Sequence, residues 1–220
     1  MRNIALISDG RTSHGIYKLI LNQIIKSKNL KYTYIVTGSH LDSSFGNSID
    51  LIKKEKYKIS YNFSLPFNSN NEKNNLKILL FYIEKISKII LKSKIDIFLG
   101  QGDRVITLAA AIACAYNKIP FAHMHGGEKS GTFDETVRHT ITKLSDFHFP
   151  STKLSFNRIL KLGEIKKNVF LTGSTAVEYI KKTKLYNKKE LFEKLKIKLV
   201  NDYVVFLYNP DNIRKKKNKK

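Results

Sequence analysis

The stretch IDIFLGQGDRVITLAAAIACAYNKIPFAHMHGGE, residues 95–128, decides the fold. It begins with an apolar run at 95–99, which predicts a strand that enters a glycine-containing turn. An alanine-rich helix is expected next, from Val105 to Ala115, followed by a second strand at 120–123. A strand, a helix and a strand in this order form the unit from which parallel sheets are built.

The chain before this stretch repeats the same pattern. Strands are predicted at 4–7 and 32–37, and amphipathic helices at 15–27 and 76–91. This repetition predicts an α/β fold with a doubly wound parallel sheet and helices on both faces. Such sheets bind ligands outside the carboxyl ends of their strands. An active site is therefore expected where the loops at those ends meet, namely residues 8–15, 37–40, 100–104 and 123–134.

The chain is strongly basic, with 40 Lys and Arg against 18 Asp and Glu and a formal net charge of +22. This balance raises the question of a nucleic-acid partner. The positive charges are spread along the predicted helices and gather in residues 214–220, which fits a solvated tail and a composition rich in Lys, Asn and Ile. We therefore expect no nucleic-acid partner and favour an anionic substrate as the reason for the positive field.

Membrane and secretion signals are not expected from this sequence. No stretch approaches the ~20 uncharged apolar residues of a membrane span, and the segment from Arg2 to Ser8 is unlike a secretory signal. A soluble cytoplasmic protein without a membrane partner is the expectation. The single cysteine, Cys114, excludes an internal disulfide and is predicted to be a small buried residue of its helix.

The pattern changes towards the C-terminal end. Residues 1–182 are predicted to form a Rossmann-like domain, residues 183–213 the start of a truncated second domain, and residues 214–220 a basic tail. The second segment contains a predicted helix at 188–195 and a strongly apolar strand at 203–208. Because one strand cannot bury its faces alone, we expect it to belong to a second domain that is largely missing.

Charged residues at the predicted strand ends are candidate site residues. Asp103 and Arg104 follow the glycine turn and form either a structural ion pair or part of a site. Two glycines directly after His123 and His125 indicate backbone close to a ligand, and Glu128 adds a titratable group. The two histidines also fit a metal site, but their spacing is not typical of zinc, and no metal is expected.

A helix is predicted to begin at Asp134. Asp134 and Arg138 then lie one turn apart on one face, and Glu135 and His139 pair on the adjacent face. Acidic residues in a first turn, with internal ion pairs, would stabilise the helix without any further role. That interpretation accounts for one carboxylate more easily than for the whole charged cluster.

Together these motifs resemble the UDP-N-acetylglucosamine 2-epimerases, from Met1 to about Pro210. The similarity is greatest to the hydrolysing branch, which makes N-acetylmannosamine for sialic acid or a related sugar for legionaminic acid. The segments that carry the resemblance are Val36-Thr-Gly-Ser-His-Leu, Gly102-Asp-Arg, His123-Met-His-Gly-Gly-Glu, Phe133-Asp-Glu-x-x-Arg-His-x-Ile-x-Lys-Leu-Ser, Leu162-Gly-Glu and Thr172-Gly-Ser.

The resemblance implies a two-domain fold of the glycosyltransferase B type with substrate in the cleft. It also implies elimination of UDP across C1 and C2 to a glycal, followed by addition of water to give the 2-epimeric free sugar. This chemistry needs a base and an acid at C2 and cations near the diphosphate, and no cofactor is expected. The implied substrate is UDP-N-acetylglucosamine or a UDP-linked 2,4-diacetamido sugar. Relatives often dimerise, so a homodimer is an open expectation.

Individual roles also follow from the resemblance. Asp103, His125 and Asp134 occupy the places of the family's acid and base residues, although some members carry Glu where His125 stands. The implied substrate-binding and supporting residues are Arg11, Arg104, Glu128, Glu135, Arg138 and His139.

Three departures from the family pattern stand against full activity. Ser13 stands where relatives carry an acidic residue, and Asn209 precedes Pro210 where relatives carry a histidine. Relatives continue for about another domain, whereas this chain ends in lysine-rich sequence that looks like the product of a shifted reading frame. The alternative to an active hydrolysing epimerase is therefore an inactive truncated remnant that acts at most as a binding fragment.

Overall fold

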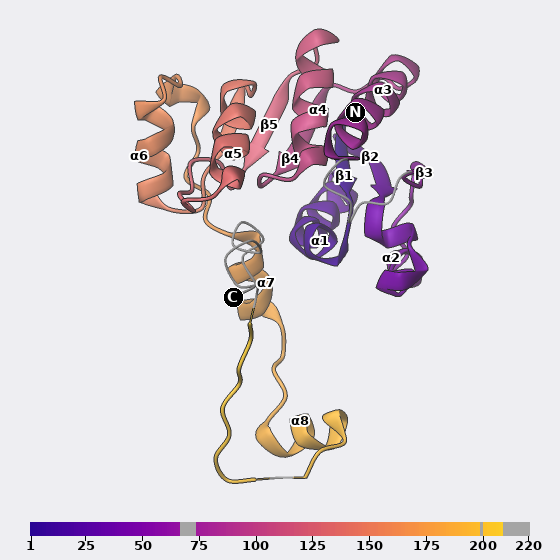
Figure 1. The fold of residues 1–220 in the computed structure, drawn as a ribbon, viewed down its shortest axis with the longest axis vertical. Coiled ribbons are helices and arrows are strands. Elements are labelled where there is room, and N and C mark those ends of the chain that lie inside the picture. Colours follow the sequence, from indigo (N-terminus) through magenta and orange to yellow (C-terminus); the bar gives the residue numbers. More distant parts are fainter. Residues whose placement is uncertain (67–73, 199, 209–220) are drawn as a thin grey trace, which may run out of the picture. The chain divides into compact units, whose positions relative to one another are not determined.

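The computed structural model describes residues 1–66, 74–198 and 200–208. The chain divides into two compact units, Met1–Glu178 and Tyr179–Lys220. The first unit contains a parallel sheet with the strand order β3-β2-β1-β4-β5-β6 (Figure 1). Its strands are β1 (Arg2–Ser8), β2 (Leu30–Thr37), β3 (Tyr61–Phe63), β4 (Ile97–Gln101), β5 (Phe121–Met124) and β6 (Phe147–Phe149).

Helices alternate with the strands along the chain, as the sequence pattern predicts. β1 lies inside the sheet, and the chain adds strands outward from it in both directions, so the doubly wound α/β fold is confirmed. The helices are α1 (Arg11–Lys26), α2 (Ile49–Lys54), α3 (Asn75–Lys92), α4 (Val105–Tyr116), α5 (Phe133–Lys143), α6 (Lys153–Lys161), α7 (Thr175–Lys182) and α8 (Lys188–Leu195).

Both faces of the sheet are buried, which explains the continuous apolar character of its inner strands. Along β1, Ala5 and Ile7 belong to a core formed with α3 and α4, whereas Leu6 between them belongs to a core formed with α1 and α2. Successive side chains of a strand point to opposite faces, so one short strand contributes to both cores. Burial of a Leu or Ile side chain contributes about 1.5–3 kcal/mol.

Helix α4 confirms the expectation for the cysteine. Cys114 is a free thiol that is fully buried in the core beside α3. Burial raises the pKa of this thiol well above its ordinary value, since the thiolate would lose its hydration. Within the described residues, no helix combines the length and apolarity needed to cross a membrane.

Helix α1 begins at Arg11, one turn before the predicted start at Gly15. The hydroxyl of Ser13 accepts hydrogen bonds from the backbone N–H groups of Asp9 (3.2 Å) and Gly10 (3.3 Å), which closes the loop onto the first turn. Free N–H groups at a helix start need such partners. Because the hydroxyl supplies them, the helix extends to the end of the β1 loop.

The second unit contains α8, at the predicted residues. The Asn187 side chain accepts from the Glu190 N–H (3.0 Å), and the Glu190 carboxylate accepts from the Asn187 N–H (3.0 Å). This reciprocal pair satisfies two N–H groups at the helix start. The capping residues therefore explain why a short helix forms here.

The predicted strand at 203–208 is wrong for the structure, because these residues form no strand. Their side chains are exposed, from 50% for Tyr203 to 94% for Val204. No strand occurs elsewhere in the second unit among the residues that the structure describes, so the segment has no ladder partner. The Asn209–Pro210 departure and the basic tail at 214–220 lie outside the described residues.

Candidate active site

A pocket of about 400 Å³ lies at the carboxyl ends of β1 and β4, which are neighbours in the sheet. Loops after β1, β2 and β4 and the N-terminus of α1 form its walls. This is the position at which parallel sheets bind ligands. The lining residues are Asp9, Gly10, Arg11, Thr12, Ser13, Ser39, Gln101, Gly102, Asp103 and Arg104.

Arg104 lines this pocket, and its ionic partner is Asp9 and not its neighbour Asp103. The Nε atom of Arg104 donates to Oδ2 of Asp9 at 2.5 Å. The Arg104 side chain is 59% exposed, whereas that of Asp9 is 8% exposed. The Asp9 carboxylate raises the pKa of Arg104 above its ordinary value. A buried carboxylate thus holds an exposed cation at the pocket.

Asp103 follows Gly102, whose φ of 71° lies in the left-handed region and turns the chain away from β4. Arg138 of α5 donates through Nη2 to Oδ2 of Asp103. The side chain of Arg138 is 8% exposed and that of Asp103 is 26% exposed. Through Nη1, Arg138 also donates to the backbone oxygen of Glu128 at 2.7 Å. One guanidinium group therefore joins the loop after β4 to the loop after β5.

His123 in β5 and His125 in the loop after it differ in environment. His123 is fully buried and does not line the pocket. Its Nε2 lies 2.7 Å from the backbone oxygen of Gly102, and its Nδ1 lies 3.2 Å from Oγ1 of Thr142. Burial lowers the pKa of His123 to about 3, so the ring is neutral near pH 7 and donates from Nε2 to the Gly102 oxygen.

His125 is half-buried and has a φ of 59°. Its Nδ1 lies 3.3 Å from Oε1 of Glu128. Its Nε2 is buried and has no hydrogen-bond partner among the described residues. The Glu128 carboxylate also accepts from the Ser151 hydroxyl at 2.7 Å, and the contact with His125 lowers the pKa of Glu128. One ring nitrogen of His125 is thus buried and unpaired within the described residues.

Helix α5 divides its predicted site residues between two environments. Asp134 is exposed in the first turn and makes no hydrogen bond or ion pair within the described part of the chain. The carboxylate of Glu135 accepts from the backbone N–H groups of Ser130 (2.8 Å) and Gly131 (2.7 Å), which lower its pKa. Nε2 of His139 lies 3.7 Å from Oε1 of Glu135, as the four-residue spacing predicts.

The structure therefore joins some of the predicted residues and not others. Asp103, Arg138, Glu128 and His125 form one chain of contacts. Arg11 and Arg104 line the pocket with Asp103, whereas His125 and Glu128 are not part of its lining. Glu135 and His139 contact each other, and Glu135 caps the loop before α5.

Sequence reasoning missed Asp9, Ser39 and Gln101 as pocket residues. Asp9 directly follows β1, in one of the loops expected to form the site, but it was not among the predicted site residues. Ser13, interpreted as a lost acidic residue, lies 3.2 Å from the Asp9 carboxylate. Ser13 thus contacts a carboxylate from the same loop.

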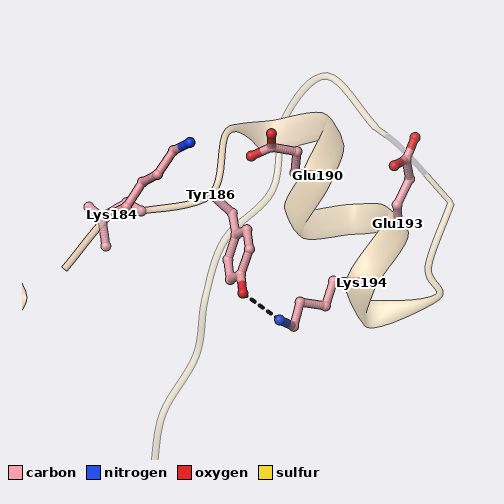
Figure 2. Close-up of a pocket in the computed structure, with 6 residues that line it drawn as sticks. Lys184, Tyr186, Glu190, Glu193 and Lys194 are labelled. Atoms are coloured by element: carbon pink, nitrogen blue, oxygen red, sulfur yellow. Dashed lines mark hydrogen bonds between the residues drawn. The ribbon is translucent and has the colours of Figure 1, made fainter.

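A second pocket, of about 690 Å³, lies beside α8 in the other unit (Figure 2). Lys194 donates to the Tyr186 hydroxyl across it. Its lining side chains are exposed, so nothing there orients a ligand as the buried groups of the first pocket do. The pocket is lined by Lys184, Leu185, Tyr186, Glu190, Glu193 and Lys194.

Within the described residues, no group of three or more His, Cys, Asp or Glu side chains could hold a metal ion.

Solved structures share the fold of this chain. UDP-GlcNAc 2-epimerase from Neisseria meningitidis, bound to UDP-GlcNAc, matches with a TM-score of 0.71 and 22% identity, over 90% of this chain and 50% of that one. The MnaA–UDP structure from S. aureus matches with a TM-score of 0.76 and 23% identity, over 89% and 52%.

Proteins with similar sequences are also named as 2-epimerases. The chain is 32% identical over 180 residues to UDP-N,N'-diacetylbacillosamine 2-epimerase (hydrolyzing) of Legionella pneumophila, covering 82% of this chain and 48% of that protein. It is 31% identical over 220 residues to GDP/UDP-N,N'-diacetylbacillosamine 2-epimerase (hydrolyzing) of Campylobacter jejuni, covering 100% and 57%. The chain thus spans about half the length of the relatives that it matches.

A family model described as UDP-N-acetylglucosamine 2-epimerase matches residues 22–220, which is most of the chain. The matched range contains β2 to β6 and the loops that carry Asp103, His125 and Asp134. The chain belongs to the UDP-N-acetylglucosamine 2-epimerase family.

Proposed function

We propose that this chain carries the acid–base residues of a hydrolysing UDP-sugar 2-epimerase. The observation that supports this most directly is the pocket whose lining includes Asp103 together with Arg11 and Arg104. A carboxylate can exchange a proton with a sugar carbon, and two cations can stabilise a diphosphate leaving group. Both requirements of the elimination meet in one small volume.

The proposed reaction has two balanced steps. In the first, a base removes the proton from C2, the C–H electrons form the C1–C2 double bond, and the C1–O bond breaks to release UDP. In the second, the oxygen of water adds to C1 and gives up one proton to a basic group, while an acid delivers a proton to the opposite face of C2. Neither step transfers electrons to or from the sugar overall, so the reaction requires no redox cofactor.

We assign the proton transfers to Asp103, His125 and Asp134. Arg138 orients the Asp103 carboxylate, and Glu128 orients the His125 ring through Nδ1, which leaves Nε2 for the sugar. Asp134 stands at the N-terminus of α5, where the helix dipole favours a negative charge. The contacts of Asp103 and His125 hold these two groups in place before substrate arrives, which is how positioning accelerates a reaction.

The relatives suggest which substrate to test first. The Legionella and Campylobacter proteins carry N,N'-diacetylbacillosamine in their names, so a UDP-linked 2,4-diacetamido sugar is the first choice. UDP-N-acetylglucosamine is the second, because it gives the family its name. The two sugars share C1, C2 and the UDP group, so the same pocket would serve either reaction.

Isotope labelling tests the proposal directly. The full chain is incubated with either UDP-sugar in D2O, and the products are analysed by NMR and mass spectrometry. We expect free UDP and a free 2-epimeric sugar with deuterium at C2, and in H2(18)O the label should enter at C1. Release of UDP without deuterium at C2 would indicate simple hydrolysis and contradict the proposed mechanism.

A binding fragment is the second candidate, because the chain spans about half the length of its relatives. In that case UDP would bind to the pocket without turnover of the UDP-sugar. Calorimetry with UDP distinguishes the two functions. Binding together with deuterium incorporation supports the epimerase, whereas binding alone supports the fragment.

A further inference from the structure

The backbone of Asp9, in the loop after β1, is held by hydrogen bonds from the loop after β2. Its backbone oxygen accepts two hydrogen bonds, one from the Ser39 N–H (2.9 Å) and one from the Ser39 hydroxyl (2.8 Å). Gly38 allows this close approach, since a Cβ at this position would lie 2.8 Å from the same oxygen. The loop after β2 therefore fixes the backbone of the loop after β1.

The side chain of Asp9 is fixed as well, by a buried chain of polar groups. The Ser13 hydroxyl lies 3.2 Å from Oδ1 of Asp9 and 2.9 Å from the Ser8 hydroxyl. Ser8 is hydrogen-bonded to Nε2 of His40 at 2.8 Å, and Nδ1 of His40 is hydrogen-bonded to Ser48 at 2.8 Å. Every member of this chain is less than a tenth exposed.

The remaining carboxylate oxygen of Asp9 accepts from Nε of Arg104, not from its terminal nitrogens. Both Nη atoms of Arg104 thus have no hydrogen-bond partner within the described part of the chain, at a pocket that Arg11 also lines. A guanidinium group offers its donors as a rigid fork that matches phosphate oxygens. With Nε held, the direction of that fork is set before any anion binds.

We infer that Asp9 is a positioning residue, which orients Arg104 so that its terminal nitrogens bind the phosphate groups of the ligand. The inference rests on the proposed function in taking a nucleotide diphosphate as that ligand. A buried carboxylate is expensive unless it is paired and hydrogen-bonded. Here the buried chain of hydrogen bonds holds the Asp9 carboxylate, and the two hydrogen bonds from Ser39 hold the Asp9 backbone. The carboxylate therefore stays in contact with the exposed Arg104 guanidinium.

Inorganic pyrophosphate is the probe for this inference, because it carries the charge and shape of the diphosphate without the nucleoside or the sugar. Its affinity for the full chain is measured by calorimetry at fixed salt, with Asp9→Asn as the variant. Removing a negative charge near an anion should tighten binding on electrostatic grounds alone. We expect instead that binding weakens, roughly threefold to tenfold, because Arg104 loses its orientation.

Asp50→Asn is the matched control. It removes the same charge from an exposed residue of α2 whose partner is Lys53, away from the pocket lining. Its pyrophosphate affinity should change by less than about twofold, since exposed charges are screened. Equal or tighter binding by Asp9→Asn than by the unchanged chain would overturn the inference, as would absence of pyrophosphate binding to the unchanged chain.

A double-mutant cycle separates positioning from a general loss of structure. In an Arg104→Ala background, Asp9→Asn should no longer weaken binding, because the residue through which Asp9 acts is absent and only the lost negative charge remains to act. The same weakening in that background would contradict the inference. If Asp9→Asn does not fold by circular dichroism, Arg104→Lys replaces it, since lysine keeps the charge without the fork; full affinity in Arg104→Lys would then overturn the inference.

Pyrophosphate binding and sugar turnover give independent answers. A chain that binds pyrophosphate in an Asp9-dependent way but incorporates no deuterium at C2 retains the inference and loses the proposed function. A chain that turns over the UDP-sugar but binds equally well with Asp9→Asn retains the function and loses the inference.

Discussion

The two Arg–Asp pairs of the site are built in opposite ways. In the pair Asp9–Arg104 the carboxylate is buried and the guanidinium is exposed, so the pair presents a cation to the pocket. In the pair Asp103–Arg138 the guanidinium is buried and the carboxylate is the more exposed member, so the pair presents an anion. The same two residue types therefore supply opposite chemistry, and burial decides which member is available.

Each pair is also backed by a buried histidine. His40 contacts Ser8 beneath Asp9, and His123 donates to the backbone oxygen of Gly102, the residue before Asp103. Burial lowers the pKa of His40 to about 4 and that of His123 to about 3, so both rings are neutral near pH 7. Because both rings are neutral, neither histidine adds a positive charge that would compete with Arg104 or Arg138 for the carboxylates.

The largest expected difference between the pairs is catalytic. Asp103→Asn should lower the rate of UDP release about a thousandfold, because a group that transfers the C2 proton is lost. Asp9→Asn should lower it only about tenfold, because Asp9 acts through Arg104. Steady-state assays of released UDP, with Asp50→Asn as the control, measure both. Similar losses for the two aspartates would break the comparison.

Both arginines should contribute to stability, for different reasons. Arg138→Met should lower the free energy of unfolding by about 3 kcal/mol, because a buried guanidinium with three hydrogen-bonded partners is removed and Asp103 is left unpaired. Arg104→Met should lower it by about as much, although most of that side chain is exposed, because the buried Asp9 carboxylate loses its cation. Urea unfolding of both variants tests this, and a loss below about 1 kcal/mol for Arg104→Met would show that the Asp9 carboxylate does not depend on Arg104.

The buried histidines predict a pH dependence of stability. The unfolded chain protonates each ring near its ordinary pKa of 6.5, whereas the folded chain does not until about pH 4 for His40 and about pH 3 for His123. Stability should therefore fall as the pH drops below 6.5, by about 2 kcal/mol for each ring at pH 5.

Replacing one histidine measures how much its ring contributes to the pH dependence of stability. The loss of unfolding free energy between pH 7 and pH 5 should be about 2 kcal/mol smaller in His123→Gln than in the unchanged chain. Thermal or urea unfolding at both pH values measures it. An identical pH slope in the variant and the unchanged chain would show that His123 is not held neutral by the fold.

The smallest expected effect is a gain in stability from a substitution at Gly15 that should leave the position of Asp9 unchanged. Gly15 lies inside α1, and a Cβ there would meet no atom within 4 Å. Gly15→Ala should therefore raise the free energy of unfolding by about 0.5–1 kcal/mol through helix propensity. Pyrophosphate affinity should stay unchanged; a change would mean that α1 stability, and not Asp9, governs the pocket.

Much of the fold could be predicted from the sequence because both faces of the sheet are buried. The predicted strands 4–7, 32–37, 95–99 and 120–123 are rich in apolar residues, and all four correspond to strands of the structure. The apolar run at 203–208 shows the limit of this reasoning. It carries the same local pattern, but strand formation needs a partner, which local sequence does not report.

The site was predictable only where chemistry is concentrated in a short motif. Asp103 and His125 stand next to glycines at strand ends, and the structure connects them through Arg138 and Glu128. The partner of Arg104 was not predictable, because Asp9 is far away in sequence and the adjacent Asp103 was the obvious candidate. Long-range ion pairs depend on which loops the sheet brings together.

The left-handed backbone of His125 has a consequence for the His-x-His motif. In an extended strand, two residues separated by one would face the same side, and their imidazoles could share a ligand. β5 ends at Met124, and the φ of 59° at the next residue interrupts that two-residue repeat. His123 is thereby committed to the interior as a donor to Gly102, while His125 is redirected towards Glu128. A single backbone torsion thus converts what reads as a chelating pair into two independent imidazoles with separate tasks.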